Sequence, residues 1–381
     1  MTGASGNVGT ALLRCLHRDD WTVTGIARRP PDSSCPPYSG ASWVACDLGA
    51  AEAPSRLATT LAGADAVVHL AWSINPSSTD PRMSRTNLIG TRQLLSAVAE
   101  AGVPHLVCLS SAAAYRPPSR WQEVGEDWPC DGVPGSLYSQ HKAHLERLLD
   151  QFLVDHPGTA VARMRPCAIV GRDAAGEFAR WLLSPLLPSS VVGRQWLPLP
   201  LWPGLRAQFV HSLDVAEAIR LVLLQRAAGP FNIAAGPPLN ARELAATISA
   251  PVIPVPRAAV LTGAWAGWRI GLQPTHPGWL RLADRAALVD PGRARDELGW
   301  RPRHDAPAAL AEVVAGIRAG TGTASAPLAA RHLPRVTERL RAITWGKPSH
   351  QTQSTRPRRR PRLTAAIFRQ SSVSSMHPPG H

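Results

Sequence analysis

The chain has 381 residues, of which 44% are hydrophobic, with 41 basic and 27 acidic side chains and a net charge of +14. This length allows one large domain or two modest ones with a real core. The chain contains no run of about 18 uncharged apolar residues and no signal-peptide pattern, which argues against a membrane span and against secretion. The six cysteines are scattered without a CxxC pair. We therefore expect no zinc site, no disulfide framework and a cytoplasmic location.

The positive charge is concentrated at the end of the chain. Residues 331–381 hold 11 basic residues and one acid, whereas residues 1–330 hold 30 basic and 26 acidic residues. The nearly balanced body gives no argument for a core that binds nucleic acid. The Arg-, Pro- and Ser-rich tail from residue 326 is expected to be disordered. It could contact nucleic acid or an anionic membrane, but we favour a solvated appendage.

Short apolar segments alternate with helical patterns through the first half of the chain. Strands are predicted at 21–27, 41–48, 66–71, 105–110 and 160–164, and amphipathic helices at 87–101 and 136–152. This alternation predicts an α/β fold with a doubly wound parallel sheet and helices on both faces.

The regular alternation ends after Gly171. Residues 173–207 are rich in Pro, Leu and Trp, while 231–235 again form a strand pattern. We expect a dinucleotide-binding domain at 1–172, rejoined by 208–236, and a smaller α/β substrate lobe at 173–207 and 237–325. The tail would occupy 326–381.

Gly3, Gly6 and Gly9 give a GxxGxxG spacing at the start of a helical pattern. This spacing suits a tight turn, close approach of the backbone to a diphosphate, and helix N-terminal amides that face the anion. Such a loop normally follows a buried strand of about five residues, but only Met1 precedes Thr2. We therefore expect a truncated first strand and a translation start that lies upstream.

Tyr138 and Lys142 lie four residues apart on a predicted helix, and therefore on one face. Only two lysines and three tyrosines occur in the chain, so both side chains stand out against its composition. A phenol is a poor base near neutral pH, but a neighbouring ammonium stabilises the phenolate. Ser111 ends a predicted strand, at the sheet edge where ligands bind in parallel α/β folds.

Several motifs occur in a characteristic order: TGASGNVG, NLIGT, LSSAAAY, YSQHK, RPCAIVG and FVHSLDVAEA. Together they resemble the extended short-chain dehydrogenase/reductases, the NAD-dependent epimerase/dehydratase group, over about residues 1–320. The resemblance implies a Rossmann domain with a smaller C-terminal substrate domain. It also implies an enzyme with a small-molecule substrate, and a homodimer is common in the family.

The resemblance assigns roles residue by residue. Tyr138 would be the acid/base, Lys142 would hold the nicotinamide ribose, and Ser111 would orient the substrate oxygen. Asn87 would support the sheet, and His69 and His211 would be packed histidines. Tyr138 and Lys142 would also contact the cofactor. The other residues expected to bind the cofactor are Gly3, Ser5, Gly6, Asn7, Val8, Gly9, Arg28, Asp47, Leu48, Leu70, Ala71, Pro166 and Cys167.

The second strand ends in Arg28 and Arg29 without the acid that usually binds the ribose hydroxyls of NAD. Arg28 can pair with a 2′-phosphate, so NADP is slightly favoured over NAD. Ala112 and Ala113 occupy the positions of the acidic pair that dehydratases of this family share, which disfavours sugar dehydration.

Three functions remain open at the level of the sequence. The first is a nucleotide-sugar epimerase-like enzyme, which the overall pattern resembles most. The second is an NADPH-dependent reductase or dehydrogenase of an apolar ketone, aldehyde or hydroxysteroid-like substrate, favoured by the apolar segment 181–206. The third is a non-catalytic nucleotide-sensing regulator.

Overall fold

The computed structural model describes residues 1–75, 81–184, 187–272 and 275–330. Residues 326–330 of the predicted tail are among them and include a 3₁₀ turn, Ala326–Leu328, whose Leu328 is fully buried. Order therefore continues a few residues past the boundary expected from composition. The rest of the predicted tail, 331–381, lies outside the described residues. None of the described helices is long and apolar enough to cross a membrane.

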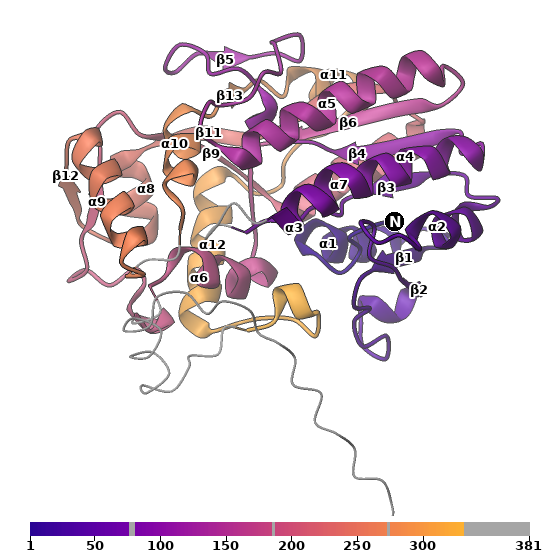
Figure 1. Ribbon diagram of the computed structural model, residues 1–381. Coiled ribbons are helices and arrows are strands. Elements are labelled where there is room, and N and C mark those ends of the chain that lie inside the picture. Colours follow the sequence, from indigo (N-terminus) through magenta and orange to yellow (C-terminus); the bar gives the residue numbers. More distant parts are fainter. Residues whose placement is uncertain (76–80, 185–186, 273–274, 331–381) are drawn as a thin grey trace, which may run out of the picture. The chain divides into compact units, whose positions relative to one another are not determined.

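The main sheet is parallel and lies in the half of the fold that begins at the N-terminus (Figure 1). One pair consists of β2 (Ser42–Ala45) and β1 (Thr24–Ala27). The other four strands run in the order β10 (Gly229–Ile233), β6 (Ala160–Pro166), β4 (His105–Leu109) and β3 (Val67–His69). All of these strands lie within or beside segments predicted from apolar runs. The strand at 229–233 pairs with β6, as the predicted return of the chain to this domain requires.

Met1 and Thr2 occupy the position of the first strand, between β1 and β3. Thr2 forms parallel bridges to both Ile26 and His69. Its amide donates to the Val68 carbonyl at 2.9 Å, while the Ile26 amide donates to the Met1 carbonyl at 2.8 Å. Met1 and Thr2 thus join the β1–β2 pair to the four strands that end in β3. The glycine loop follows at the carboxyl edge of the sheet.

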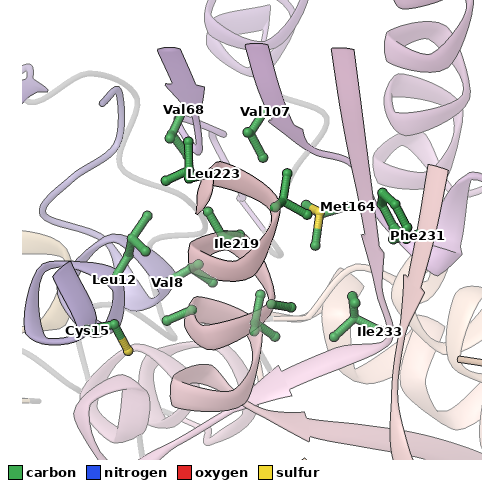
Figure 2. Close-up of a cluster of buried hydrophobic side chains, with 14 of the residues drawn as sticks. Val8, Leu12, Cys15, Val68, Val107, Met164, Ile219, Leu223, Phe231 and Ile233 are labelled. Carbon is green, nitrogen blue, oxygen red and sulfur yellow. The ribbon is translucent and has the colours of Figure 1, made fainter. Parts of the chain in front are cut away.

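Helices cover both faces of this sheet because its strand residues alternate between two cores. Val68, Val107 and Ala162 face α1 (Asn7–Leu16) and α7 (Ser212–Gln225) in one cluster, shown in Figure 2. The neighbouring Val67, Leu106 and Val161 belong to the opposite cluster, with α2 (Ala53–Leu61), α4 (Gly90–Glu100) and α5 (Leu137–Asp155). Successive strand residues point to opposite faces, so most positions of a sheet buried on both sides are apolar. The polar exceptions, such as His69, Arg163 and Arg165, find partners inside the fold.

The helix predicted at 87–101 is observed in two parts. A short α3 (Pro81–Ser84) is followed by a π-helical turn, Arg85–Ile89, and only then by α4. Such turns are rare and are frequently found at functional sites. Here the turn carries Asn87 at the carboxyl edge of the main sheet.

A second, smaller group of elements follows β7 (Ala168–Val170), which continues the line of β6. It contains β9 (Arg206–His211) between β7 and β11 (Ala235–Asn240), with α6 (Ala175–Leu182), α8 (Ala241–Ile248) and α12 (Ala306–Ala319) sharing one apolar cluster. The pair β8 (Leu199–Leu201) and β12 (Val252–Pro254) lies beside α9 (Arg257–Arg269), which precedes α10 (Pro277–Arg285). The predicted division into domains stays a prediction.

Two further elements return to the first half of the chain. The strand β13 (Leu288–Val289) pairs in parallel with β5 (Glu123–Val124), and α11 (Gly292–Leu298) packs on α7. These contacts hold the loop between β4 and α5, on which the candidate site is built.

Candidate active site

The glycine loop has a backbone geometry that only glycine satisfies at two of its three positions. Gly3 has φ +65°, and a Cβ there would lie 2.6 Å from the Ala71 nitrogen. A Cβ on Gly9 would lie 2.4 Å from the Gly3 carbonyl oxygen. Gly6 differs, because its Cβ would meet only the Gly3 oxygen, at 3.3 Å. Gly3 and Gly9 are therefore required by packing, whereas Gly6 leaves space beside the loop.

The N-terminus of α1 is available to an anion. Gly6 is its N-cap and provides no side-chain cap, and the first turn carries no acid. Because the first amides of a helix have no partner within it, they present partial positive charge at this end. Together with the flanking Ser5 and Val8, both buried, these features fit the diphosphate of a dinucleotide.

The carboxyl ends of β1 and β2 supply the next predicted cofactor residues. Arg28 follows β1 directly and is exposed. Asp47 accepts a hydrogen bond from the Gly49 amide at 3.2 Å and one from the Arg85 guanidinium at 2.5 Å. Leu48 is buried beside it. Arg85 is a partner that sequence reasoning missed, since 38 residues separate it from Asp47.

At the end of β3, the backbone is fixed by hydrogen bonds from Asn87. Its Oδ1 accepts from the Ser73 amide at 2.7 Å, and its Nδ2 donates to the Ser73 carbonyl at 3.0 Å. Asn87 thus holds the segment after Leu70 and Ala71, which agrees with the supporting role expected from the sequence. Leu70 is buried and Ala71 half-buried.

His69 is a buried structural residue, as predicted. The Thr91 hydroxyl donates to the Asn87 carbonyl at 2.7 Å, so it accepts from Nε2–H of His69 at 3.0 Å. The Thr2 hydroxyl then donates to Nδ1 at 2.7 Å. Burial lowers the pKa of His69 to about 3, with the charge of Lys142 acting in the same direction. A neutral ring with both nitrogens bonded is not available for proton transfer near neutral pH.

Tyr138 and Ser111 meet at the carboxyl edge of the sheet. Tyr138 lies in the first turn of α5, whose N-cap Ser136 accepts from the Ser139 amide. Ser111 follows β4 and caps a 3₁₀ turn, Ala112–Ala114, by accepting from the Ala113 amide at 3.1 Å. The Ser111 side chain lies close enough to Tyr138 to act on its phenol. Burial raises the pKa of Tyr138 and the Ser111 side chain opposes that shift, so the phenol stays protonated at neutral pH.

Lys142 lies one helical turn beyond Tyr138 and is almost completely buried. Its ammonium donates to the Leu109 carbonyl at 2.7 Å and lies 3.7 Å from the centroid of the Trp72 ring. Burial lowers the pKa of Lys142 to about 7. Among the interactions of the described residues, Lys142 makes no direct contact with Tyr138. The expected lowering of the Tyr138 pKa by the ammonium is therefore not what this arrangement produces.

A small pocket opens beside Tyr138. It is lined by Asn75, Met83, Ser136, Leu137, Tyr138, His276, Gly278 and Trp279. The rings of Tyr138 and Trp279 lie 5.0 Å apart between centroids, with their planes tilted by 34°. Trp279 belongs to α10, far away in the sequence, and no sequence signal linked it to the tyrosine. The walls of this pocket combine apolar side chains, such as Met83, Leu137 and Trp279, with polar ones.

Pro166 and Cys167 lie where the chain passes from β6 to β7. Pro166 is buried and Cys167 half-buried, and the Cys167 amide donates to the Ile233 carbonyl at 3.0 Å. Burial raises the pKa of the Cys167 thiol, which makes it an unreactive neighbour. Their place at the sheet edge is the one expected from the sequence.

Sequence reasoning missed a buried ionic network between α5 and β6, one helical turn beyond Lys142. Glu146, one turn beyond Lys142, accepts from the Ser110 hydroxyl at 2.5 Å and from Nε and Nη2 of Arg165 at 2.9 and 2.8 Å. Arg163 contacts the same carboxylate at 3.2 Å. Burial alone would raise the pKa of Glu146, but the hydrogen bonds and charge of Arg165 outweigh it and lower the pKa. The network fixes α5 against β4 and β6.

Within the described residues, one group of potential metal ligands was found: His211, His304 and Glu312, with ligand atoms within 4.8 Å of one another. The His211 Nδ1 accepts from the Leu213 amide at 3.1 Å, which leaves its proton on Nε2, the nitrogen 3.2 Å from Glu312. The two imidazoles stack at 4.1 Å, so their in-plane lone pairs do not converge. This geometry suits packed histidines better than a metal site.

Comparison with known proteins places this geometry in context. Residues 1–234 match the model of the NAD dependent epimerase/dehydratase family. An uncharacterized protein of Mycobacterium tuberculosis is 27% identical over 324 residues, which are 84% of this chain but only 30% of that protein. The chain therefore spans about a third of the length of its mycobacterial relatives.

Two further similarities cover nearly the whole of the compared protein. A 4-hydroxy-2-methyl-3-oxo-4-farnesyl-3,4-dihydroquinoline-1-oxide ketoreductase of Stigmatella aurantiaca is 26% identical, with 80% of this chain and 91% of that protein covered. The structure of a Thermus thermophilus UDP-glucose 4-epimerase in complex with NAD superposes with a TM-score of 0.64 at 22% identity, covering 84% and 98% of the two chains. The second likeness shows the fold.

Proposed function

Since the chain belongs to the NAD-dependent epimerase/dehydratase family, whose relatives are epimerases, dehydratases and a ketoreductase, we propose that this enzyme interconverts a carbonyl and a secondary alcohol on an apolar substrate. The observation that carries the proposal is Tyr138, with Ser111 beside it, at a small pocket whose wall includes the Trp279 ring. This choice puts the reductase ahead of the nucleotide-sugar epimerase that the sequence pattern alone ranked first.

In the reductive direction, the residues of the chain bind and protonate the carbonyl oxygen. The chemistry that a reduced nicotinamide would supply, when bound, is hydride transfer to the carbonyl carbon. Because its pKa is raised by burial, the Tyr138 phenol keeps its proton and can act as the general acid. The Ser111 hydroxyl, beside the phenol, orients the same oxygen. Lys142, with a pKa of about 7, can hold or release a proton near neutral pH one turn away.

Two observations support an apolar substrate. Arg206, on β9, is buried and donates to the Asp284 carbonyl at 3.0 Å and the Ala286 carbonyl at 3.2 Å. Its guanidinium is thus used within the fold. The ketoreductase relative acts on a farnesylated dihydroquinoline, a substrate with a large apolar part. Ala112 and Ala113 provide no acid or base for dehydration.

A second candidate function, nucleotide-sugar epimerisation, is favoured by one cation near the pocket. Arg281 lies on α10 with Trp279, and its guanidinium lies 2.6 Å from the point where a Cβ on Gly135 would be. Gly135 precedes Ser136, which lines the pocket. A positive charge here suits a diphosphate. Both candidates use the same Tyr138 chemistry and differ in whether cofactor is consumed.

The test uses the full-length enzyme with NADPH or NADH and two substrates, trans-1-decalone and UDP-glucose. We expect oxidation of reduced cofactor with decalone, followed at 340 nm, and a loss of about 10²–10⁴-fold in Tyr138→Phe. Conversion of UDP-glucose without net cofactor consumption, and no turnover of decalone, would select the epimerase. Unchanged activity in Tyr138→Phe would move the chemistry to another residue.

We also propose that Arg28 recognises the 2′-phosphate of NADP. Arg28 is exposed at the end of β1, and no acid is available there for the ribose hydroxyls. Arg28→Ala should weaken NADPH binding by about tenfold and leave NADH binding unchanged. Arg29→Ala is the matched control, since it removes the same charge one residue later. Equal effects of Arg28→Ala on both cofactors would remove this role.

A further inference from the structure

Two segments of the second half of the chain contain no acidic residue. Residues 178–213 and 244–283 have no Asp or Glu, and each carries three arginines. The rest of residues 1–330 holds all 26 acids of that range, so the distribution is uneven. We call these two stretches the acid-free segments.

The acid-free segments are neighbours in the structure. Strand β8 of the first pairs in parallel with β12 of the second, with Val252 opposite Leu199. Val260 of α9 packs on the cluster that contains Trp202 and Leu205. Figure 1 shows α9 and β12 together at the edge of the ribbon opposite α2. The two segments therefore form one continuous part of the fold.

This part exposes large apolar side chains. Of the ten large hydrophobic residues that are strongly exposed among the described residues, six lie in the acid-free segments. These six, each 47–67% exposed, are Leu182, Trp196, Ile253, Trp265, Ile270 and Leu272. Helix α9 has no buried residue along its thirteen positions. An exposed apolar surface of this kind usually marks a site where another molecule binds.

We propose that the acid-free segments dock on the surface of an anionic lipid bilayer. Tryptophan and isoleucine side chains partition into the interfacial region, where the indole keeps its polar edge hydrated. Arg257 pairs with Asp284 at 2.7 Å, and Arg206 is buried. Arg194 and Arg269, however, are exposed and form no ion pair with the described residues. Such unpaired arginines are attracted to anionic headgroups. A protein partner would ordinarily be matched by both signs of charge across the interface, whereas the acid-free segments offer only one. The exposed apolar side chains and the positive charge therefore both favour an anionic bilayer.

The docking surface is connected to the candidate active site. The Trp268 ring of α9 contacts the His276 ring, with 4.8 Å between centroids. His276 and Trp279 line the pocket that contains Tyr138. If the proposed function holds, an apolar carbonyl substrate dissolved in the bilayer reaches this pocket beside the docked surface. Vesicle binding, however, does not require catalysis, so the two proposals fail separately.

The experiment measures co-sedimentation of the full-length protein with vesicles of phosphatidylcholine alone and of phosphatidylcholine with phosphatidylglycerol, 3:1. The apolar test variant is Trp265→Glu/Ile270→Glu, and its control is Leu224→Glu, a residue exposed on α7 outside the segments. The charge test variant is Arg194→Gln/Arg269→Gln. Its control is Arg318→Gln, exposed on α12. Thermal unfolding verifies that each variant is folded.

We expect binding to the anionic vesicles to exceed binding to neutral ones, and each test variant to lose about tenfold in partitioning. The two controls should bind as the native protein does. Equal binding of all variants would overturn the proposal and assign any lipid affinity to residues outside the segments. A loss of self-association in Trp265→Glu/Ile270→Glu, measured by light scattering without lipid, would overturn it in favour of a second copy of the chain.

Discussion

The ammonium of Lys142 lies 3.7 Å from the centroid of the Trp72 indole and donates to the Leu109 carbonyl at 2.7 Å. The ring face and the carbonyl stabilise the charge, but water is excluded, and burial prevails in lowering the pKa to about 7. Lys142 therefore changes protonation state near neutral pH. This placement, next to the carboxyl ends of β3 and β4, makes it the most pH-sensitive group of the candidate site.

The buried Lys142 should make the stability of the protein increase with pH. Its pKa is about 7 in the folded chain and 10.5 in the reference state, so the unfolded chain binds more protons between these values. The free-energy cost of burying the charged ammonium is therefore complete below pH 7 and disappears as the pH approaches 10.5. Lys142→Met removes it, so its advantage over the native protein should shrink by up to about 5 kcal/mol between pH 6 and pH 10. Urea unfolding at both pH values measures this, and a difference independent of pH would contradict it.

The Glu146 carboxylate should be essential for stability. In Glu146→Gln the buried Arg165 loses its counter-charge, so we expect a loss of about 3 kcal/mol in the free energy of unfolding. Asp150→Asn is the control, since Asp150 also pairs with Arg163, at 2.6 Å, but its side chain is 65% exposed. That variant should change stability by less than about 1 kcal/mol. Similar losses in both variants, measured by chemical denaturation, would show that burial of the pair is not decisive.

Alanine substitutions at two glycines of the loop should have different effects, one on stability and the other on cofactor affinity. Gly9→Ala places a Cβ 2.4 Å from the Gly3 oxygen, so it should lose about 2 kcal/mol of stability or more. In Gly6→Ala the nearest atom is 3.3 Å away, so the fold should tolerate the methyl group. Because that methyl group enters the space beside the helix N-terminus, NAD(H) affinity should fall. Calorimetric unfolding and cofactor titration distinguish the two, and unchanged NAD(H) affinity in Gly6→Ala would contradict the assigned diphosphate site.

Trp279 should control the binding of substrate rather than the chemical step. Trp279→Ala removes the ring that lies against Tyr138, so an apolar substrate loses contact area and its KM should rise about tenfold. The kcat should change much less, because the 3₁₀ turn that Ser111 caps and the first turn of α5 still position Ser111 and Tyr138. Trp196→Ala, which removes an exposed indole remote from the pocket lining, is the control. A fall in kcat with unchanged KM would instead make Trp279 a positioning residue for the tyrosine.

Local sequence patterns were sufficient for the framework of the fold. Segments of five to eight residues rich in apolar side chains marked strands of the main sheet, because most positions of a sheet covered on both faces are buried. The spacing of Gly3, Gly6 and Gly9 likewise reflects contacts within the loop and with Ala71, which are short-range requirements of the backbone. The break of the 87–101 helix into a π turn and α4 was not visible, since it depends on what Asn87 bonds to in space.

The chain by itself determined the parallel α/β class, the anion-binding loop and the common face of Tyr138 and Lys142, because each depends on periodicity or on residues close in sequence. Only the tertiary structure decided what these side chains meet. The tertiary structure brings Trp72 to Lys142, Trp279 to Tyr138 and Arg165 to Glu146, each from a separate segment of the chain. Their burial, which moves the pKa of Lys142 down and that of Tyr138 up, is a property of the packed interior and has no counterpart in the local sequence.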